Sequence, residues 1–132
     1  MHKIMALDVG TKRIGIALSD YLQVIAVPHS CIPRMPERKA VDEIIKIAKE
    51  NRVEKIVIGL PKNMDGSIGF QGEDCINFSQ NFTGFDIIME DERLTSEEAE
   101  ERLRSRKVDF RKNKGLVDIE SACVILEQYL GK

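Results

Sequence analysis

The sequence has few of the residues that build disulfides, zinc sites and histidine-activated nucleophiles. Among its 132 residues are only three cysteines and two histidines. Cys31, Cys75 and Cys123 are odd in number, lie far apart and form no C-x-x-C pair, so neither a disulfide framework nor a zinc site is expected. With only His2 and His29 available, a Cys–His or Ser–His nucleophile is hard to build. The cysteines are therefore expected to be small core residues of a protein from a reducing compartment.

Signals for export and membrane insertion are also missing. The chain runs from Met1 directly into an apolar segment that reads as a strand, and no apolar run approaches the length of a membrane-spanning helix. A cytoplasmic protein with no membrane contact is expected. The length and the 42% apolar content predict a single globular domain over residues 1–132.

Acidic and basic residues are separated along the chain although the net charge is only −2. Seven acidic residues and one basic residue lie between Glu90 and Glu101, whereas seven basic residues and one acidic residue lie between Arg102 and Lys114. An acidic cluster beside a basic one suits a metal site flanked by phosphate contacts. The alternative is a solvated helix surface with mixed ion pairs, which is the commoner meaning of charge runs.

Hydrophobic patterns predict a mixed α/β sheet in the order β-β-β-α-β-α-β-α-α. A three-stranded antiparallel meander is expected first, extended by parallel strands through helical crossovers, and Pro28 suits an edge strand. A capping box at Thr95–Glu98 predicts a helix start. Strands are expected at residues 4–7, 13–19, 24–27, 55–59 and 86–89. Helices are expected from Pro36 through 48, around Cys75–Phe82, from 95 to about 106, and at 117–130.

Three carboxylates stand out as candidate metal ligands. Asp8 closes an apolar run in the expected central strand, where an unpaired charge would cost several kcal/mol; a cation would remove that cost, and a turn hydrogen bond is the alternative. Glu92 follows the fifth strand, where helix-dipole charge is the alternative. Asp118 precedes an apolar helix face, where a plain N-cap is the alternative. Together, hard oxygen ligands without Cys or His suit two Mg²⁺ or Mn²⁺ ions and phosphoryl displacement.

Four segments carry a family resemblance. The opening motif is Ala6–Gly15 (ALDVGTKRIG) and the second is Ile58–Pro61 (IGLP) with Asn63–Gly66 (NMDG). The third is Asp91–Ser96 (DERLTS) and the fourth is Val117–Leu126 (VDIESACVIL). In this order and spacing they resemble the YqgF/RuvX family, whose members are described as pre-16S rRNA nucleases or as Holliday junction resolvases.

The resemblance implies a ribonuclease H-like fold, with a mixed five-stranded sheet flanked by helices. It also implies catalytic and metal-binding roles for Asp8, Glu92 and Asp118, and processing of the 5′ end of pre-16S rRNA in the bacterial cytoplasm. Candidate nucleic-acid contacts are Lys12, Arg13, Arg93, Arg104, Arg106, Lys107, Arg111 and Lys112.

Two departures from related nucleases bear on the substrate. Junction resolvases carry a glutamate on the fourth strand, whereas this chain has Val57–Leu60 there, so junction cleavage requires Glu92 to take over. The stretch Ser67–Gly72 also matches the family less cleanly.

Other interpretations stay open. An actin-like or sugar-kinase ATPase has a phosphate-binding hairpin similar to Asp8–Thr11, but it needs two lobes, and this chain has no internal repeat. A non-catalytic module that binds rRNA would leave the same residues. RNA is expected rather than a DNA junction, because the core largely accounts for the apolar residues and leaves no stripe for a stable dimer interface of about 800 Å² per partner. A monomer or weak homodimer is therefore predicted.

Overall fold

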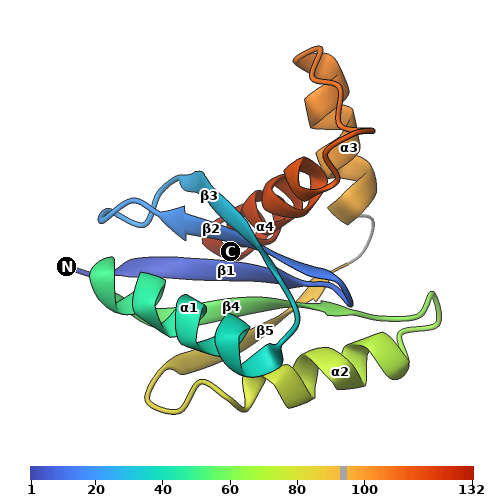
Figure 1. Cartoon of the computed structure of the whole chain (residues 1–132). Helices are drawn as coiled ribbons and strands as arrows, with labels where there is room; N and C mark the ends of the chain where they lie inside the picture. Colours follow the sequence, from blue (N-terminus) through green and yellow to red (C-terminus); the bar gives the residue numbers. More distant parts are fainter. Residues whose placement is uncertain (93–94) are drawn as a thin grey trace.

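A five-stranded mixed sheet forms the centre of the protein (Figure 1). The structure is a computed structural model that describes residues 1–92 and 95–132. The strand order is β3-β2-β1-β4-β5; β1, β2 and β3 are antiparallel neighbours, and β4 and β5 extend the sheet in parallel to β1. The strands are β1 (Lys3–Val9), β2 (Arg13–Ser19), β3 (Ala26–Pro33), β4 (Val53–Pro61) and β5 (Asp86–Glu92).

Four helices complete the described part of the chain, and they confirm the predicted order of elements. Figure 1 shows α1 and α2 together on one side of the sheet and α4 on the other, while α3 extends beyond α4. Among residues 1–92 and 95–132, no helix combines the length and the apolar composition that a membrane crossing requires. The helices are α1 (Glu37–Glu50), α2 (Phe70–Ser79), α3 (Thr95–Ser105) and α4 (Gly115–Leu130).

The alternation along the strands divides the apolar residues between two cores. On β2, Ile14, Ile16 and Leu18 point toward α1 and α2, while Ala17 points toward α4. On β1, Ile4 and Ala6 likewise face α4. The sheet is therefore covered on both faces, as the continuous apolar run in β1 predicts.

The third strand begins later than predicted. Residues 24–27 were expected to form it, but β3 starts at Ala26, and Val24 and Ile25 are 67% and 57% exposed. The reason is local: the backbone N–H groups of Val24 and Ile25 donate to Oδ1 of Asp20 at 2.8 and 3.0 Å, which fixes a turn there. Pro28 does lie in an edge strand.

The segment between β2 and β3 also corrects the expectation that the core accounts for most of the apolar residues. Leu22 is 71% exposed, and Tyr21 and Val27 are each 43% exposed, next to the exposed Val24 and Ile25. The connection between β2 and β3 therefore presents apolar side chains that neither core buries.

The second helix lies earlier than predicted, at Phe70–Ser79, so that Phe82 follows it. The other elements differ from the predictions mainly in length. β4 and β5 are longer than expected, so that Glu92 is the last residue of β5 and does not follow it. α4 begins at Gly115, two residues earlier than predicted. α3 begins at Thr95, where the capping box predicts a helix start, but the cap itself involves side chains outside the described residues.

Candidate active site

Asp8 lies near the C-terminal end of the central strand and on the face covered by α4. It follows Ala6 at the two-residue period of a strand, and Ala6 packs in the core under α4. Its neighbours Leu7 and Val9 are buried, but part of Asp8 stays open to solvent. The central position predicted for this carboxylate is confirmed.

Gly15 allows α4 to begin directly beside Asp8. Gly15 is the residue of β2 that pairs with Asp8 across the antiparallel ladder. A Cβ atom at position 15 would lie 2.0 Å from the carbonyl oxygen of Asp118, which no real side chain can tolerate. The absence of a side chain there lets the first turn of α4 rest on the sheet, and this turn carries Asp118.

Gly59 has a similar role on the other side of Asp8. It follows Ile58, the residue of β4 that pairs with Leu7. A Cβ atom at position 59 would lie 2.4 Å from Oε2 of Glu92 and 2.6 Å from Cδ1 of Ile125. The carboxylate of Glu92 therefore extends from β5 over β4, into the space that a side chain of the fourth strand would fill.

The pKa of Asp8 reflects both its burial and the two other candidate carboxylates. Burial, followed by the charges of Glu92 and then Asp118, raises the pKa of Asp8 well above its usual range. Burial raises the pKa of Glu92 to about 7. The nearby hydroxyl of Ser121 opposes the shift of Asp8, yet among residues 1–92 and 95–132 this fully buried oxygen has no partner at hydrogen-bond geometry. Negative charge is thus confined on this face of the sheet, beside a buried hydroxyl.

Asp118 is held by a basic side chain from β2. Nε of Arg13 donates to Oδ2 of Asp118 at 2.7 Å, and both side chains are partly exposed. Sγ of Cys31 lies 3.9 Å from the same oxygen. Burial raises the pKa of the Cys31 thiol to about 11, so it stays protonated at neutral pH and is no nucleophile.

As the side chains are placed, residues 1–92 and 95–132 contain no group of three or more His, Cys, Asp or Glu residues that could hold a metal ion. Asp8 and Glu92 converge, while Asp118 is directed to Arg13. The arrangement can bind a cation through hard oxygen atoms once Asp118 exchanges this partner.

A buried arginine that contacts the turn after Asp8 was missed by the sequence analysis. Arg34 is 6% exposed and forms two hydrogen bonds with Asp74 on α2, at 2.9 and 3.0 Å. Its Nη1 also donates to the carbonyl oxygen of Gly10 at 3.0 Å, two residues after Asp8, and its guanidinium lies 4.7 Å from the ring centroid of Phe78. Arg34 lies between two elements, where no periodicity marks it, so no sequence signal could have identified it.

The candidate nucleic-acid contacts fall into two groups. Some already have acidic partners: Arg13 pairs with Asp118, and Arg106 contacts Glu120 on α4 at 2.9 Å. Arg104 and Arg111 have looser contacts, with Glu100 at 3.5 Å and with Asp109 at 3.2 Å. The second group, Lys12, Lys107 and Lys112, is exposed, and Arg93 lies outside the described residues.

Comparison with known proteins agrees with this architecture. A family model described as "RuvX: Holliday junction resolvase" matches residues 2–132. Two curated relatives carry the name "Putative pre-16S rRNA nuclease". The one from Clostridioides difficile is 43% identical, covering 97% of this chain and 93% of the relative; the one from Crocosphaera subtropica is 44% identical, covering 98% and 94%.

Solved structures resemble the fold at much lower identity. A Fowlpox virus resolvase in complex with Holliday junction DNA matches with a TM-score of 0.58 and 12% identity, over 98% of this chain and 97% of the resolvase. RuvC from T. thermophilus in complex with a Holliday junction substrate matches with a TM-score of 0.55 and 8% identity, over 99% and 97%. These resolvases share the predicted ribonuclease H-like fold. With its full-length family match and relatives above 40% identity, the chain belongs to the RuvX family.

Proposed function

We propose that this protein is a metal-dependent nuclease that hydrolyses phosphodiesters in RNA, and that it processes the 5′ end of pre-16S rRNA. The observation that carries the proposal is that Asp8 and Glu92 converge from β1 and β5 on the face of the sheet covered by α4, where the charge of Asp118 also acts on Asp8. The names of the curated relatives support the substrate. Such a substrate would place the protein in the bacterial cytoplasm, as one catalytic domain.

The residues at this site fit Mg²⁺ or Mn²⁺. Carboxylate oxygens are the donors that these hard cations prefer. Burial of negative charge raises the pKa of Asp8 and Glu92, and a cation would reverse that effect. The buried Ser121 hydroxyl lies beside Asp8, where its O–H can donate to a carboxylate and its lone pairs can accept from a water. Two bound ions would supply an activated water and stabilise the leaving oxygen.

Asp8, Glu92 and Asp118 would hold the ions, and Arg13 has a separate task. Its guanidinium occupies Asp118 at 2.7 Å and is itself partly exposed. With Asp118 holding an ion, the Arg13 guanidinium would be released from it and could pair with a substrate phosphate at the same place. Arg13 would thus balance the charge of Asp118 before binding and contact the substrate afterwards.

A second candidate function is cleavage of four-way DNA junctions. The family description and the fold shared with two junction resolvases favour it. The carboxylate of Glu92 lies over Gly59, so it could replace the glutamate that β4 lacks. Symmetric junction cleavage requires two sites at a fixed separation, hence a stable dimer. RNA remains our choice because the relatives above 40% identity carry the rRNA nuclease name.

The deciding experiment compares cleavage of three substrates by one preparation. These are a precursor rRNA 5′ segment, a single-stranded RNA and a synthetic four-way junction, each with Mg²⁺, with Mn²⁺ and with a chelator. Asp8→Asn should abolish cleavage, whereas Asp42→Asn on the exposed surface of α1 serves as the matched control and should not. Light scattering gives the oligomeric state, for which we expect a monomer or weak dimer. Paired symmetric nicks in the junction by a stable dimer, with the RNAs intact, would refute the RNA proposal.

A further inference from the structure

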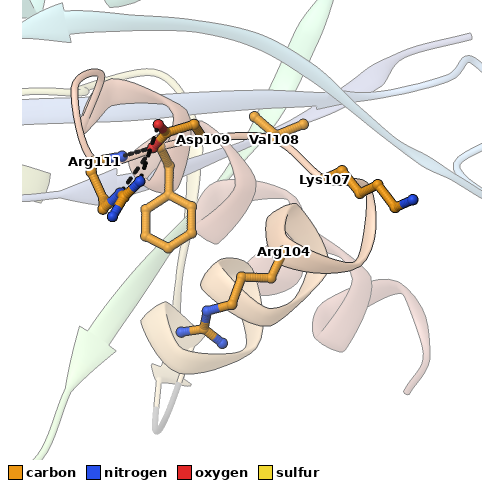
Figure 2. Close-up of a pocket in the computed structure, with 6 residues that line it drawn as sticks. Arg104, Lys107, Val108, Asp109 and Arg111 are labelled. Atoms are coloured by element: carbon orange, nitrogen blue, oxygen red, sulfur yellow. Dashed lines mark hydrogen bonds and ion pairs between the residues drawn. The ribbon is translucent and has the colours of Figure 1, made fainter.

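A hollow lies at the end of α3, within the connection to α4 (Figure 2). It is an open hollow with a volume of about 410 Å³, within the range of small-ligand sites in proteins. Figure 2 shows side chains from the last turns of α3 and from the following loop around it. Its lining consists of Arg104, Lys107, Val108, Asp109, Phe110 and Arg111.

The lining combines one aromatic ring with three cationic side chains. The guanidinium of Arg104 lies 5.8 Å from the ring centroid of Phe110, and the Arg104 side chain is 61% exposed. Arg111 is 85% exposed, and its Nε donates to Asp109 at 3.2 Å. The carboxylate of Asp109 offsets one of the three cations, so the hollow stays net positive.

The backbone fixes this loop in place. The Lys107 N–H donates to the carbonyl oxygen of Arg104 at 2.9 Å, and Lys107 has a φ of 58°, which ends α3 with a left-handed residue. The Arg111 N–H donates to Oδ1 of Asp109 at 3.1 Å. The ring and the cations are therefore held on a defined turn.

We propose that this hollow binds one unpaired nucleotide of the substrate, with its base on Phe110 and Arg104, and with Arg111 and Lys107 available to the phosphates on either side of it. Bases stack on aromatic rings and on guanidinium planes, and such stacking requires a base outside a duplex. The loop that lines the hollow continues into Gly115, where α4 begins, and the first turn of α4 carries Asp118. This inference rests on the proposed nuclease function. It adds that the substrate must contain a single-stranded segment.

The test measures binding without cleavage, in buffer with a chelator. The probes are a short oligoadenylate and an abasic oligomer of the same length, which carries the phosphates but no bases. Phe110→Ala should weaken oligoadenylate binding about tenfold and leave abasic binding unchanged, because only the stacking contribution is lost. Tyr21→Ala is the matched control, since Lys3 lies 4.9 Å from the Tyr21 ring in a similar cation–π pair at the opposite end of β1. Tyr21→Ala should change neither affinity.

A second variant covers the case in which Phe110→Ala does not fold. The protein has no tryptophan, so Phe110→Trp introduces a single tryptophan in the hollow, which can be excited apart from the two tyrosines. Its emission should be quenched by oligoadenylate but not by the abasic oligomer or by an oligoglutamate peptide. Lys107→Gln with Arg111→Gln should weaken binding of both oligomers and lower the dependence of log K on log salt by about 1 to 2.

The outcomes separate this inference from the proposed function. If oligoadenylate leaves the emission of the Phe110→Trp variant unchanged, or if Phe110→Ala binds both oligomers as the wild type does, the nucleotide site is refuted even where metal-dependent cleavage is observed. Quenching by the peptide would instead identify a site for acidic protein segments and would also refute it. Base-dependent quenching without any cleavage would support the site and refute the nuclease.

Discussion

Replacement of Glu92 by glutamine should make the metal-free protein more stable at alkaline pH. Burial raises the pKa of Glu92 from 4.5 to about 7, so the folded state holds the proton more tightly than the unfolded state does. The stabilisation due to this proton is complete below pH 4.5 and is lost as the pH rises through 7. Glutamine keeps the shape of the protonated side chain and cannot ionise, so the variant escapes this loss.

The magnitude follows from the pKa values. A rise from 4.5 to about 7 corresponds to about 3 kcal/mol, at about 1.36 kcal/mol for each pH unit. This is an upper value, because the negative charge of Glu92 raises the pKa of Asp8, so that Asp8 binds part of the proton that Glu92 releases. For a domain of this size, it corresponds to a rise of about 10 °C in Tm.

Urea unfolding of wild type and Glu92→Gln, with a chelator, should be followed from about pH 4.5 to about 8.5. The difference in unfolding free energy should grow across this range, whereas the exposed Glu101→Gln on α3 should show no such growth. Saturating Mg²⁺ should then stabilise the wild type more than Glu92→Gln, because a ligand that binds only the folded state adds stability. A Glu92→Gln variant that is less stable than wild type at every pH would refute the claim that the ionised, buried Glu92 carboxylate destabilises the metal-free protein.

Three further predictions test the side chains in and around the site. Asp8→Asn should keep the fold, raise Tm in metal-free buffer near pH 8 and abolish cleavage, because it removes a charge whose pKa burial has raised; calorimetry and a cleavage assay check both parts. Arg34→Ala should cost about 2–4 kcal/mol in chemical unfolding, because it removes a buried side chain that packs on Phe78 and bonds Gly10 and Asp74. Asp74→Asn should cost less, because the Gly10 carbonyl and Glu37 still face the guanidinium. Gly15→Ala should destabilise the protein and reduce cleavage, because a methyl group 2.0 Å from the Asp118 carbonyl oxygen forces α4 away; wild-type Tm and rate would contradict this.

The order of the elements and the central place of Asp8 could be predicted because they depend on local patterns. The alternation in Arg13–Ser19 and the continuous apolar run before Asp8 indicate a sheet that is covered on both faces, with the second of these segments as its central strand. Both patterns are local and do not depend on the rest of the chain. The start of β3 could not be predicted in the same way. Val24 and Ile25 have strand propensity, but a single side chain, Asp20, binds both of their N–H groups and holds them in a turn.

The ion-pair partners of the charged residues could not be predicted from the sequence, for a different reason. The segregation of charge along the chain is visible, but the contacts join residues that are distant in sequence or on neighbouring helices. Arg106 contacts Glu120, and Arg34 contacts Asp74 across 40 positions. A basic stretch therefore mixes residues that hold α3 to α4 with residues that face solvent, and only the packing of the two helices separates them.

Glycine placement brings the three candidate carboxylates onto one face of the sheet. Asp8 lies on the central strand, and each neighbouring strand has a glycine beside it: Gly15 on β2 and Gly59 on β4. Over Gly15 lies the backbone of Asp118, and over Gly59 lies the carboxylate of Glu92. A side chain at either position would displace one of the two. The lack of a glutamate on β4 is therefore part of how this site is built, because a β4 side chain would occupy the space that Glu92 enters from β5.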